Sequence, residues 1–269
     1  MTALLDVQGL SKSFGGVQAV DNVSFQIASG ELLALIGPNG AGKSTTFNMV
    51  NGQLRADRGS IRLGGTELNR LPPRAIWKLG VGRTFQIAAT FASLSVVENV
   101  QMALLSFDRL LFNPWRKAAA HKRMEAIHLL EQVGMDAQAD RPSSELAYGD
   151  VKRVELAIAL ANAPKLLLMD EPTAGMAPQE RNDLMALTKK LVLERNLAVL
   201  FTEHSMDVVF AYADRVIVLA RGQLIAEGTP ASIRNDPLVQ QVYFGSGNTF
   251  EKKKKQPVQP DLATQDAAP

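Results

Sequence analysis

The sequence predicts an α/β fold built around a mixed, mostly parallel β-sheet. Two apolar runs, 32–36 and 166–169, have the length and the unbroken hydrophobic character of strands that are buried on both faces of a parallel sheet. Each run is followed by a polar or glycine-rich turn and then by a segment with helical character, which is the order of strand–helix units. With 269 residues, of which 46% are hydrophobic, the chain can fill one large domain or two small ones.

The remaining elements are expected in order along the chain. Phe25 and Ile27 alternate with polar residues, which indicates that the first 30 residues form strands. Between about residues 96 and 141 apolar residues recur at helical spacing, so a helical insertion interrupts the α/β pattern. Further helices are expected at 43–51, near Ile76, at 150–162, at 178–194 and from Met206, and further strands at 60–63, 81–85, 197–201, 216–219 and 224–226. The polar tail from Glu251 onward, with lysines at 252–255, is expected to be disordered.

Composition and charge exclude several classes of protein. The net charge of +2 is too small to indicate a nucleic-acid partner. The chain has no cysteine, which rules out disulfides, cysteine zinc sites and a thiol nucleophile. No apolar run approaches the roughly 18 residues that a membrane-spanning helix needs, and the first residues lack the basic and apolar regions of a signal peptide. If this protein works at a membrane, we expect it to work from the surface.

Residues 37–44 match the pattern G-x-x-x-x-G-K-S between a predicted buried strand and a predicted helix. Glycines allow backbone N–H groups to close around phosphate oxygens, and the helix N-terminus adds its dipole. Lys43 brings a positive charge to the outer phosphates, and the hydroxyl of Ser44 is a suitable Mg²⁺ ligand. The motif in this context predicts a site for a nucleoside triphosphate.

Two carboxylates, Asp170 and Glu171, directly follow the apolar run 166–169. The carboxyl end of a parallel strand lies at the sheet edge where ligands bind. We expect Asp170 to reach Mg²⁺ through water there, and Glu171 to polarise an attacking water as a general base. A solvated acidic pair at a strand end is the alternative interpretation, and the phosphate-binding motif earlier in the chain favours the catalytic one.

With these motifs the sequence resembles the ABC ATPase family, up to about Gly245. Residues 37–45 and 166–171 resemble the Walker A and Walker B motifs of that family. Gln86 matches its Q-loop, His204 matches its switch histidine, and Phe14 matches the aromatic residue that stacks on adenine. The signature motif Leu-Ser-Gly-Gly-Gln, which separates ABC proteins from other P-loop NTPases, is resembled by Leu146, Ala147, Tyr148, Gly149 and Asp150.

This resemblance implies a P-loop NTPase core with an N-terminal antiparallel β subdomain and an inserted helical subdomain. Residues 1–95 and 151–245 would form the two parts of the core, 96–150 the helical subdomain that ends in the signature, and 246–269 a tail. ATP and Mg²⁺ are the implied ligands, with Glu171, His204 and Gln86 as catalytic residues and Ser44, Gln86 and Asp170 around the metal ion. The implied ATP contacts within one subunit are Phe14, Gly37, Pro38, Asn39, Gly40, Ala41, Gly42, Lys43, Ser44 and Thr45.

In such proteins two ATPase domains pair head to tail around ATP, and the signature of one completes the site of the other. Several positions depart from the family pattern. Ala147 replaces the serine and Asp150 the glutamine of the signature, and Ala177 replaces an aspartate that makes a polar contact across the dimer. We therefore expect this chain's own site to be complete and its contribution to the partner's site to be weaker.

Several segments resemble the importer branch for branched-chain amino acids and related hydrophobic or amide solutes, namely 14–16, 82–86, 171–176, 227–230 and 242–245. The stretch 105–120 resembles the longer helical insert of one of that branch's two ATPase subunits. This implies a heterodimer in preference to a homodimer, together with two transmembrane permease subunits and a periplasmic solute-binding protein. The expected location is the cytoplasmic side of the inner membrane, at its periphery.

Three other classes stay open at this point. The ATPase of a lipopolysaccharide exporter shares much of the pattern but is usually shorter and lacks that insert. A soluble ABC ATPase acting on ribosomes or DNA usually has two ATPase domains or a long coiled coil. A nucleotide-binding regulator would not hydrolyse ATP, and the presence of both Glu171 and His204 argues against it. Co-purification of permease subunits, of ribosomes or of neither distinguishes a transporter from the last two classes.

Overall fold

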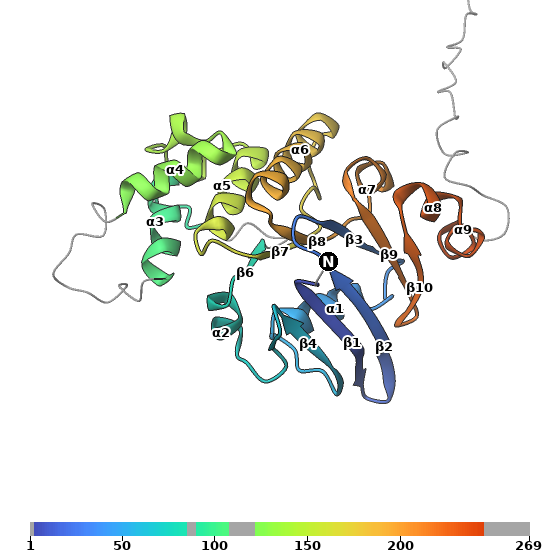
Figure 1. Ribbon diagram of the computed structural model, residues 1–269. Coiled ribbons are helices and arrows are strands. Elements are labelled where there is room, and N and C mark those ends of the chain that lie inside the picture. The colour runs from blue at the N-terminus through green and yellow to red at the C-terminus, as the bar shows by residue number, and fades with distance from the viewer. Residues whose placement is uncertain (1–2, 85–89, 108–121, 245–269) are drawn as a thin grey trace, which may run out of the picture.

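The computed structural model describes residues 3–84, 90–107 and 122–244, which form two β-sheets flanked by helices (Figure 1). The expected α/β fold is confirmed. Within the described residues the core sheet has six strands in the order β10-β9-β3-β8-β7-β6. The parallel strands are β3 (Leu32–Ile36), β6 (Val81–Thr84), β7 (Leu166–Asp170), β8 (Ala198–Thr202) and β9 (Arg215–Ala220), and β10 (Gln223–Gly228) pairs antiparallel with β9.

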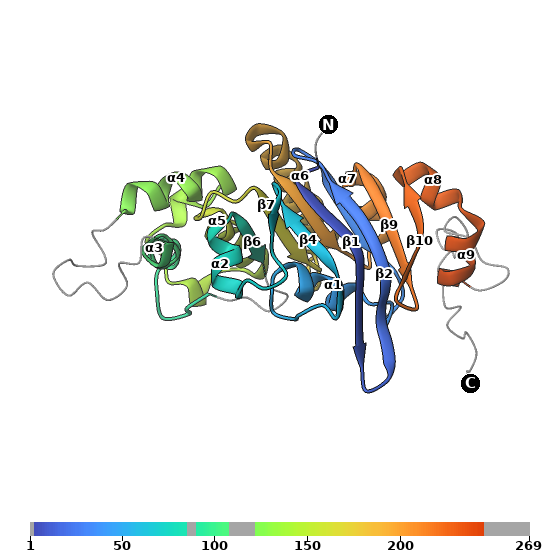
Figure 2. The same cartoon turned by 60° about the horizontal axis from the view of Figure 1, so that its bottom comes forward.

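A second, antiparallel sheet lies against one face of the core sheet (Figure 1). Its order is β2-β1-β4-β5, with β1 at Leu5–Phe14, β2 at Val17–Ile27, β4 at Arg58–Leu63 and β5 at Thr66–Glu67. The strands expected in the first 30 residues are therefore confirmed, whereas β5 was not predicted. The hairpin of β1 and β2 projects beyond the rest of this sheet (Figure 2). Helix α1 (Lys43–Val50) lies between the two sheets.

The longer helices cover the other face of the core sheet. Helices α3 (Val96–Phe107), α4 (Arg123–Val133) and α5 (Tyr148–Leu160) pack together at one end, and α6 (Pro178–Arg195) and α7 (Met206–Tyr212) continue the layer (Figure 1). Short 3-10 turns occur at Asp136–Gln138 and Ser143–Glu145. The remaining described helices are α2 (Pro73–Lys78), α8 (Pro230–Asn235) and α9 (Pro237–Phe244).

The helix expected at 150–162 was placed two residues too late, because α5 begins at Tyr148. Its N-cap residue, Ala147, has no side-chain oxygen to mark the start. Helices α8 and α9 were not predicted. Most of the 105–120 insert, the residue Gln86 and the lysines at 252–255 lie outside the described residues.

Strand β3 shows why strands of the parallel sheet appear in the sequence as unbroken apolar runs. Leu33 and Leu35 pack into the layer with the antiparallel sheet and α1, whereas Leu32, Ala34 and Ile36 pack into the helical layer. All five side chains are fully buried. Successive side chains of a strand point to opposite faces, so burial on both faces requires every position to be apolar.

The parallel strands bring three segments with predicted site residues to one edge of the core sheet. β8 pairs with both β3 and β7, and the three strands end on the same side. The glycine-rich loop 37–42 follows β3, Glu171 follows β7, and His204 lies two residues beyond β8. This edge is where ligands bind in open α/β sheets.

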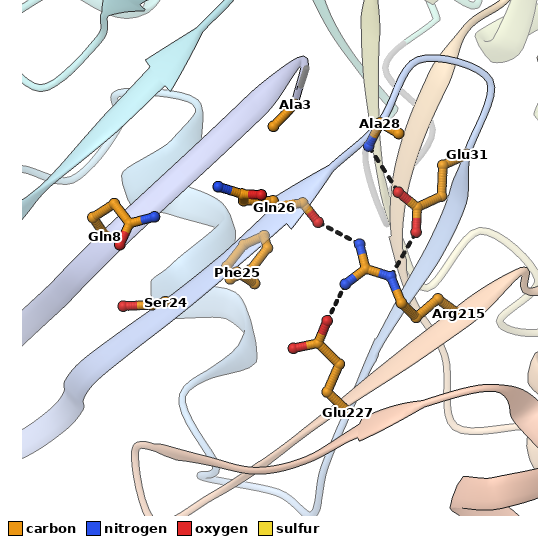
Figure 3. Close-up of a pocket in the computed structure, with 9 residues that line it drawn as sticks. All are labelled: Ala3, Gln8, Ser24, Phe25, Gln26, Ala28, Glu31, Arg215 and Glu227. Atoms are coloured by element: carbon orange, nitrogen blue, oxygen red, sulfur yellow. Dashed lines mark hydrogen bonds and ion pairs between the residues drawn. The ribbon is translucent and has the colours of Figure 1, made fainter. Parts of the chain in front are cut away.

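Arg215 joins the two sheets at a polar pocket of about 440 Å³ (Figure 3). Its Nε donates to Glu31 Oε1 at 2.7 Å, and its two terminal nitrogens donate to Glu227 and to the backbone oxygen of Gln26. The second oxygen of Glu31 accepts the N–H of Ala28 at 2.7 Å. The Glu31 hydrogen bond raises the pKa of Arg215 against the opposing effect of burial. Since these polar groups pair with one another, the pocket acts as a structural joint.

We predict that Arg215→Met lowers the free energy of unfolding by about 2 kcal/mol, because it leaves Glu31 without its charged partner. Urea unfolding followed by circular dichroism measures the change. Arg55→Met, at an exposed position, is the matched control and should cost less than about 0.5 kcal/mol. A loss at Arg215 as small as that of the control would contradict the assignment of a structural joint.

Candidate active site

The glycine-rich loop between β3 and α1 is closed by two glycines that have no room for a side chain. A Cβ on Gly37 would lie 2.2 Å from the backbone oxygen of Leu219. Gly42 has a φ of +104°, and a Cβ there would lie 2.5 Å from the backbone oxygen of Ala19. Both close approaches require glycine. The motif therefore packs the loop against neighbouring strands as well as leaving its amides accessible.

Lys43 lies across this loop and is 8% exposed. Its Nζ donates to the backbone oxygens of Gly37 at 2.7 Å and Pro38 at 3.2 Å. Burial lowers the pKa of Lys43, while the negative charges of Glu171 and Asp170 raise it by a smaller amount. The ammonium group is thus held inside the loop, within electrostatic range of both carboxylates. Ser44, the next residue, is exposed.

Asp170 is held from both sides at the end of β7. The Thr202 hydroxyl donates to Asp170 Oδ1 at 2.8 Å. The Thr202 hydroxyl oxygen in turn accepts the Glu171 backbone N–H at 3.0 Å. Arg83, from β6, places its Nη2 3.5 Å from Asp170 Oδ2. Sequence reasoning assigned no role to Thr202 or to Arg83. The position of Thr202 at the end of a parallel strand beside β7 is the signal that could have found it.

Glu171 and His204 meet at the same edge. His204 Nε2 lies 2.8 Å from Glu171 Oε1. Glu171 has a φ of +49°, in the left-handed region that residues other than glycine rarely adopt. Such conformations persist where the surrounding structure imposes them, often at functional sites. The two side chains are 23% and 50% exposed, so the pair opens to solvent.

The first turn of α5 carries the signature-like residues. Ala147 and Tyr148 are exposed, Leu146 and Asp150 are half-buried and Gly149 is buried. A Cβ on Gly149 would lie 3.1 Å from the carboxylate of Glu180 and 3.6 Å from the terminal methyl of Met176. The start of α5 therefore packs against the segment 171–177 that links β7 to α6.

Phe14 ends β1 at the tip of the projecting hairpin. Its side chain is 48% exposed, and its cross-strand partner Val17 is 70% exposed. Lys12 places its Nζ 5.5 Å from the centre of the Phe14 ring and pairs with Asp57 at 2.6 Å. Asp57 also accepts the backbone N–H of Ser13. The hairpin tip thus offers an anchored apolar surface that is open to solvent.

The C-terminal helices lie beside the glycine-rich loop. A cavity of about 580 Å³ lies beside their contact, lined by residues 38–41 of the loop, by the turn between β9 and β10, and by Leu238, Gln241 and Val242 of α9. Burial raises the pKa of the Tyr243 hydroxyl, and its contact with the Gly37 backbone opposes this shift. Helix α9 therefore contacts the start of the loop directly.

Comparison with known families gives two matches. A family model described as ABC transporter matches residues 20–174. A second, described as branched-chain amino acid ATP-binding cassette transporter, matches residues 223–248, which include α8 and α9.

Curated relatives align over nearly their whole length. The chain is 39% identical to the high-affinity branched-chain amino acid transport ATP-binding protein BraF of Pseudomonas aeruginosa, covering 90% of this chain and 98% of BraF. It is 40% identical to the corresponding protein LivG of Salmonella typhimurium, with the same coverage. Among solved structures, a nucleotide-free ATP-binding cassette from an ABC transporter superposes with a TM-score of 0.82, at 31% identity, over 91% of this chain and all of that one. A cassette in its ADP conformation gives 0.83 at the same identity and coverage.

We predict that ATP binding takes up a proton at alkaline pH. The lowered pKa of Lys43 in the free protein should rise when phosphate oxygens surround its ammonium group. Below the lowered pKa, Lys43 is protonated in both states and affinity does not depend on it. Between the two values, affinity falls as pH rises and up to one proton is bound per ATP.

Titration calorimetry in two buffers of different ionisation enthalpy measures this uptake. The matched control Lys190→Met changes a lysine of α6 whose side chain is 66% exposed, and should leave the uptake unchanged. Absence of proton uptake by the wild-type chain up to pH 10.5, the ordinary lysine value, would contradict the prediction.

Proposed function

Since this chain belongs to the ATP-binding subunits of ABC transporters, which bind and hydrolyse ATP, we propose that it drives import of branched-chain amino acids or related hydrophobic or amide solutes. The observation that carries the proposal is the match of residues 223–248 to the C-terminal segment of branched-chain amino acid transporters. The relatives BraF and LivG, named for transport of these amino acids, align over 98% of their length. Helix α9 lies in the matched segment and contacts the glycine-rich loop, so this segment adjoins the site.

In the proposed site the loop 37–45 holds the phosphates of ATP and Phe14 stacks on its adenine ring. The open apolar surface of Phe14 and Val17 suits a base, since aromatic rings stack in offset geometry. The ATP-contacting residues are then Phe14, Gly37, Pro38, Asn39, Gly40, Ala41, Gly42, Lys43, Ser44 and Thr45. Lys43 exchanges its contacts with loop carbonyls for contacts with phosphate oxygens.

The residues at the sheet edge fit Mg²⁺. Asp170 and Ser44 offer the hard oxygen ligands that this ion prefers, and Gln86 would add an amide oxygen. No cluster of three or more acidic, histidine or cysteine side chains is found in residues 3–84, 90–107 and 122–244. The bound ion would neutralise charge on the phosphates, and the hydrogen bond from Thr202 holds the Asp170 carboxylate in place at the sheet edge.

Glu171 is the proposed general base. Its carboxylate accepts a proton from the water that attacks the γ-phosphoryl group. His204, which contacts Glu171 through Nε2, orients this carboxylate and contacts the γ-phosphate. Gln86, the third proposed catalytic residue, helps to position the water and the metal ion.

The exposed start of α5 supports a head-to-tail pair with a second ABC ATPase subunit. We propose a heterodimer because the stretch 105–120 resembles the insert of one of the two ATPase subunits of such importers. Helix α5 has 13 residues, and its N-terminal amides and dipole favour a phosphate group of the partner's ATP. Leu146, Ala147, Tyr148, Gly149 and Asp150 would form that contact. Ala147 and Ala177 supply no hydroxyl or carboxylate to it, so the partner's site should be the weaker of the two.

A groove of about 320 Å³ between the helical layer and the core supports a contact with two permease subunits. It is lined by α2, β6, α3 and α5, and includes Trp77, Ile158 and Arg83. Because Arg83 also approaches Asp170, an occupant of the groove would lie one side chain from the site. The helical part, 96–150, would pass motion between ATP and permease, with 1–95 and 151–245 forming the core and 246–269 a tail.

In the part of the chain that the structure describes, no helix is long and apolar enough to cross a membrane. The likeness to transport ATP-binding proteins supports our proposal that separate permease subunits provide the spans and that a periplasmic protein delivers the solute. This chain would then sit peripherally on the cytoplasmic side of the inner membrane.

We predict that Glu171→Gln binds ATP with wild-type affinity but turns it over at least about a hundredfold more slowly, the contribution typical of a general base. Steady-state phosphate release and equilibrium binding of a fluorescent ATP analogue measure the two quantities. Glu194→Gln, at an exposed position near the end of α6, is the matched control and should behave like the wild type. Near-normal turnover by Glu171→Gln would contradict the proposed mechanism.

A further inference from the structure

Glu203 is a buried carboxylate between β8 and α7 for which the mechanism above has no use. Its side chain is 3% exposed, although the next residue, His204, opens to solvent. Burying an ionised carboxylate is costly unless hydrogen bonds satisfy its oxygens. The surrounding structure must therefore supply hydrogen bonds to the Glu203 carboxylate.

Both oxygens of Glu203 accept hydrogen bonds. Oε1 accepts the backbone N–H of Thr173 at 2.9 Å and its hydroxyl at 2.6 Å, and Oε2 accepts the backbone N–H of His204 at 3.1 Å. Thr173 is 1% exposed and lies 30 residues earlier in the chain. One carboxylate thus joins the backbone of the segment after β7 to the backbone of His204.

This joint lies beside the hydrolytic pair. Thr173 is two residues from Glu171, and His204 is the residue that contacts Glu171. The left-handed backbone at Glu171 turns the segment 171–177 sharply at this point. With Glu203 in place, the distance between the two side chains is set by a closed ring of contacts through Thr173, Glu203, His204 and Glu171.

A second tie holds the far end of the same two segments. Arg181 Nε donates to the Met176 backbone oxygen at 2.8 Å, and its Nη1 donates to the Ser205 hydroxyl at 3.0 Å. These two bonds of Arg181 reach the backbone of the segment after β7 but only a side chain, that of Ser205, in the segment after β8. The backbone of His204 is therefore held by Glu203 and not by these bonds.

We propose that Glu203 is a positioning residue for ATP hydrolysis, fixing His204 against Glu171 through its hydrogen bonds to Thr173 and to the His204 backbone. The inference rests on the proposed roles of Glu171 and His204. It assigns Glu203 no contact with ATP, so its loss should lower turnover and leave ATP binding intact.

The substitution Glu203→Gln tests this with little change of shape. An amide has one acceptor oxygen and one donor nitrogen, so either the Thr173 donors or the His204 N–H would face an N–H group. We expect kcat to fall at least about tenfold, which corresponds to about 1.4 kcal/mol, while the Kd for ATP stays within about twofold. Asp207→Asn, in the exposed first turn of α7, is the matched control and should match the wild type.

A double-mutant cycle separates positioning from a general loss of structure. His204→Ala and the pair Glu203→Gln with His204→Ala are compared for kcat in the full chain. If Glu203 acts through His204, adding Glu203→Gln to His204→Ala lowers kcat by less than about twofold further. Multiplication of the two single losses, or a kcat of Glu203→Gln within about twofold of the wild type, would overturn the proposal.

Thr173→Val and Thr173→Ser provide the same test if Glu203→Gln does not fold. Valine removes only the 2.6 Å hydroxyl contact and serine keeps it, so the first should lose turnover and the second should retain it. Equal turnover of the two would overturn the proposal. The proposed role of Glu171 is tested separately. Normal turnover by Glu171→Gln would contradict that role, whatever the result for Glu203→Gln.

Discussion

The last pairing between β7 and β8 determines where the acidic groups of the site lie. Asp170 is the register partner of Thr202, and the Thr202 hydroxyl both donates to the Asp170 carboxylate and accepts the Glu171 N–H. A second contact, from the Glu171 N–H to the Thr202 backbone oxygen at 3.2 Å, extends the pairing by one residue. The chain then turns through the left-handed conformation of Glu171, which directs this carboxylate toward His204.

The segment 171–177, which follows this turn, connects two surfaces that we propose contact ATP: the hydrolytic pair and the first turn of α5. On one side it is joined to the residues after β8 through Glu203 and Arg181. On the other, Met176 and Glu180 lie against Gly149 in the first turn of α5. A change at Glu171 and His204, the proposed hydrolytic pair, can therefore reach the surface that we propose faces a second subunit without crossing the core of the domain.

The sequence predicts the strands and the glycine-rich loop well, because their signals are local. The hydrogen bonds that organise the site are not local, since Thr202 and Glu203 contact partners 30 to 32 residues away. Nothing in the sequence next to Glu203 indicates its burial, because the Thr173 donors lie 30 residues earlier. Helices α8 and α9 were not predicted, although both begin at a proline, Pro230 and Pro237, and proline is favoured at the first helical position.

Exchange of Thr202 tests most directly whether the pairing of β7 with β8 organises catalysis. Thr202→Val keeps the shape and removes the hydroxyl, and Thr202→Ser keeps the hydroxyl. Steady-state ATP turnover and ATP binding are measured for both. The expected result is a fall in kcat of at least about tenfold for valine, retained turnover for serine, and a Kd for ATP within about twofold for both, since the phosphate-binding loop is untouched. Wild-type turnover by Thr202→Val would contradict the account.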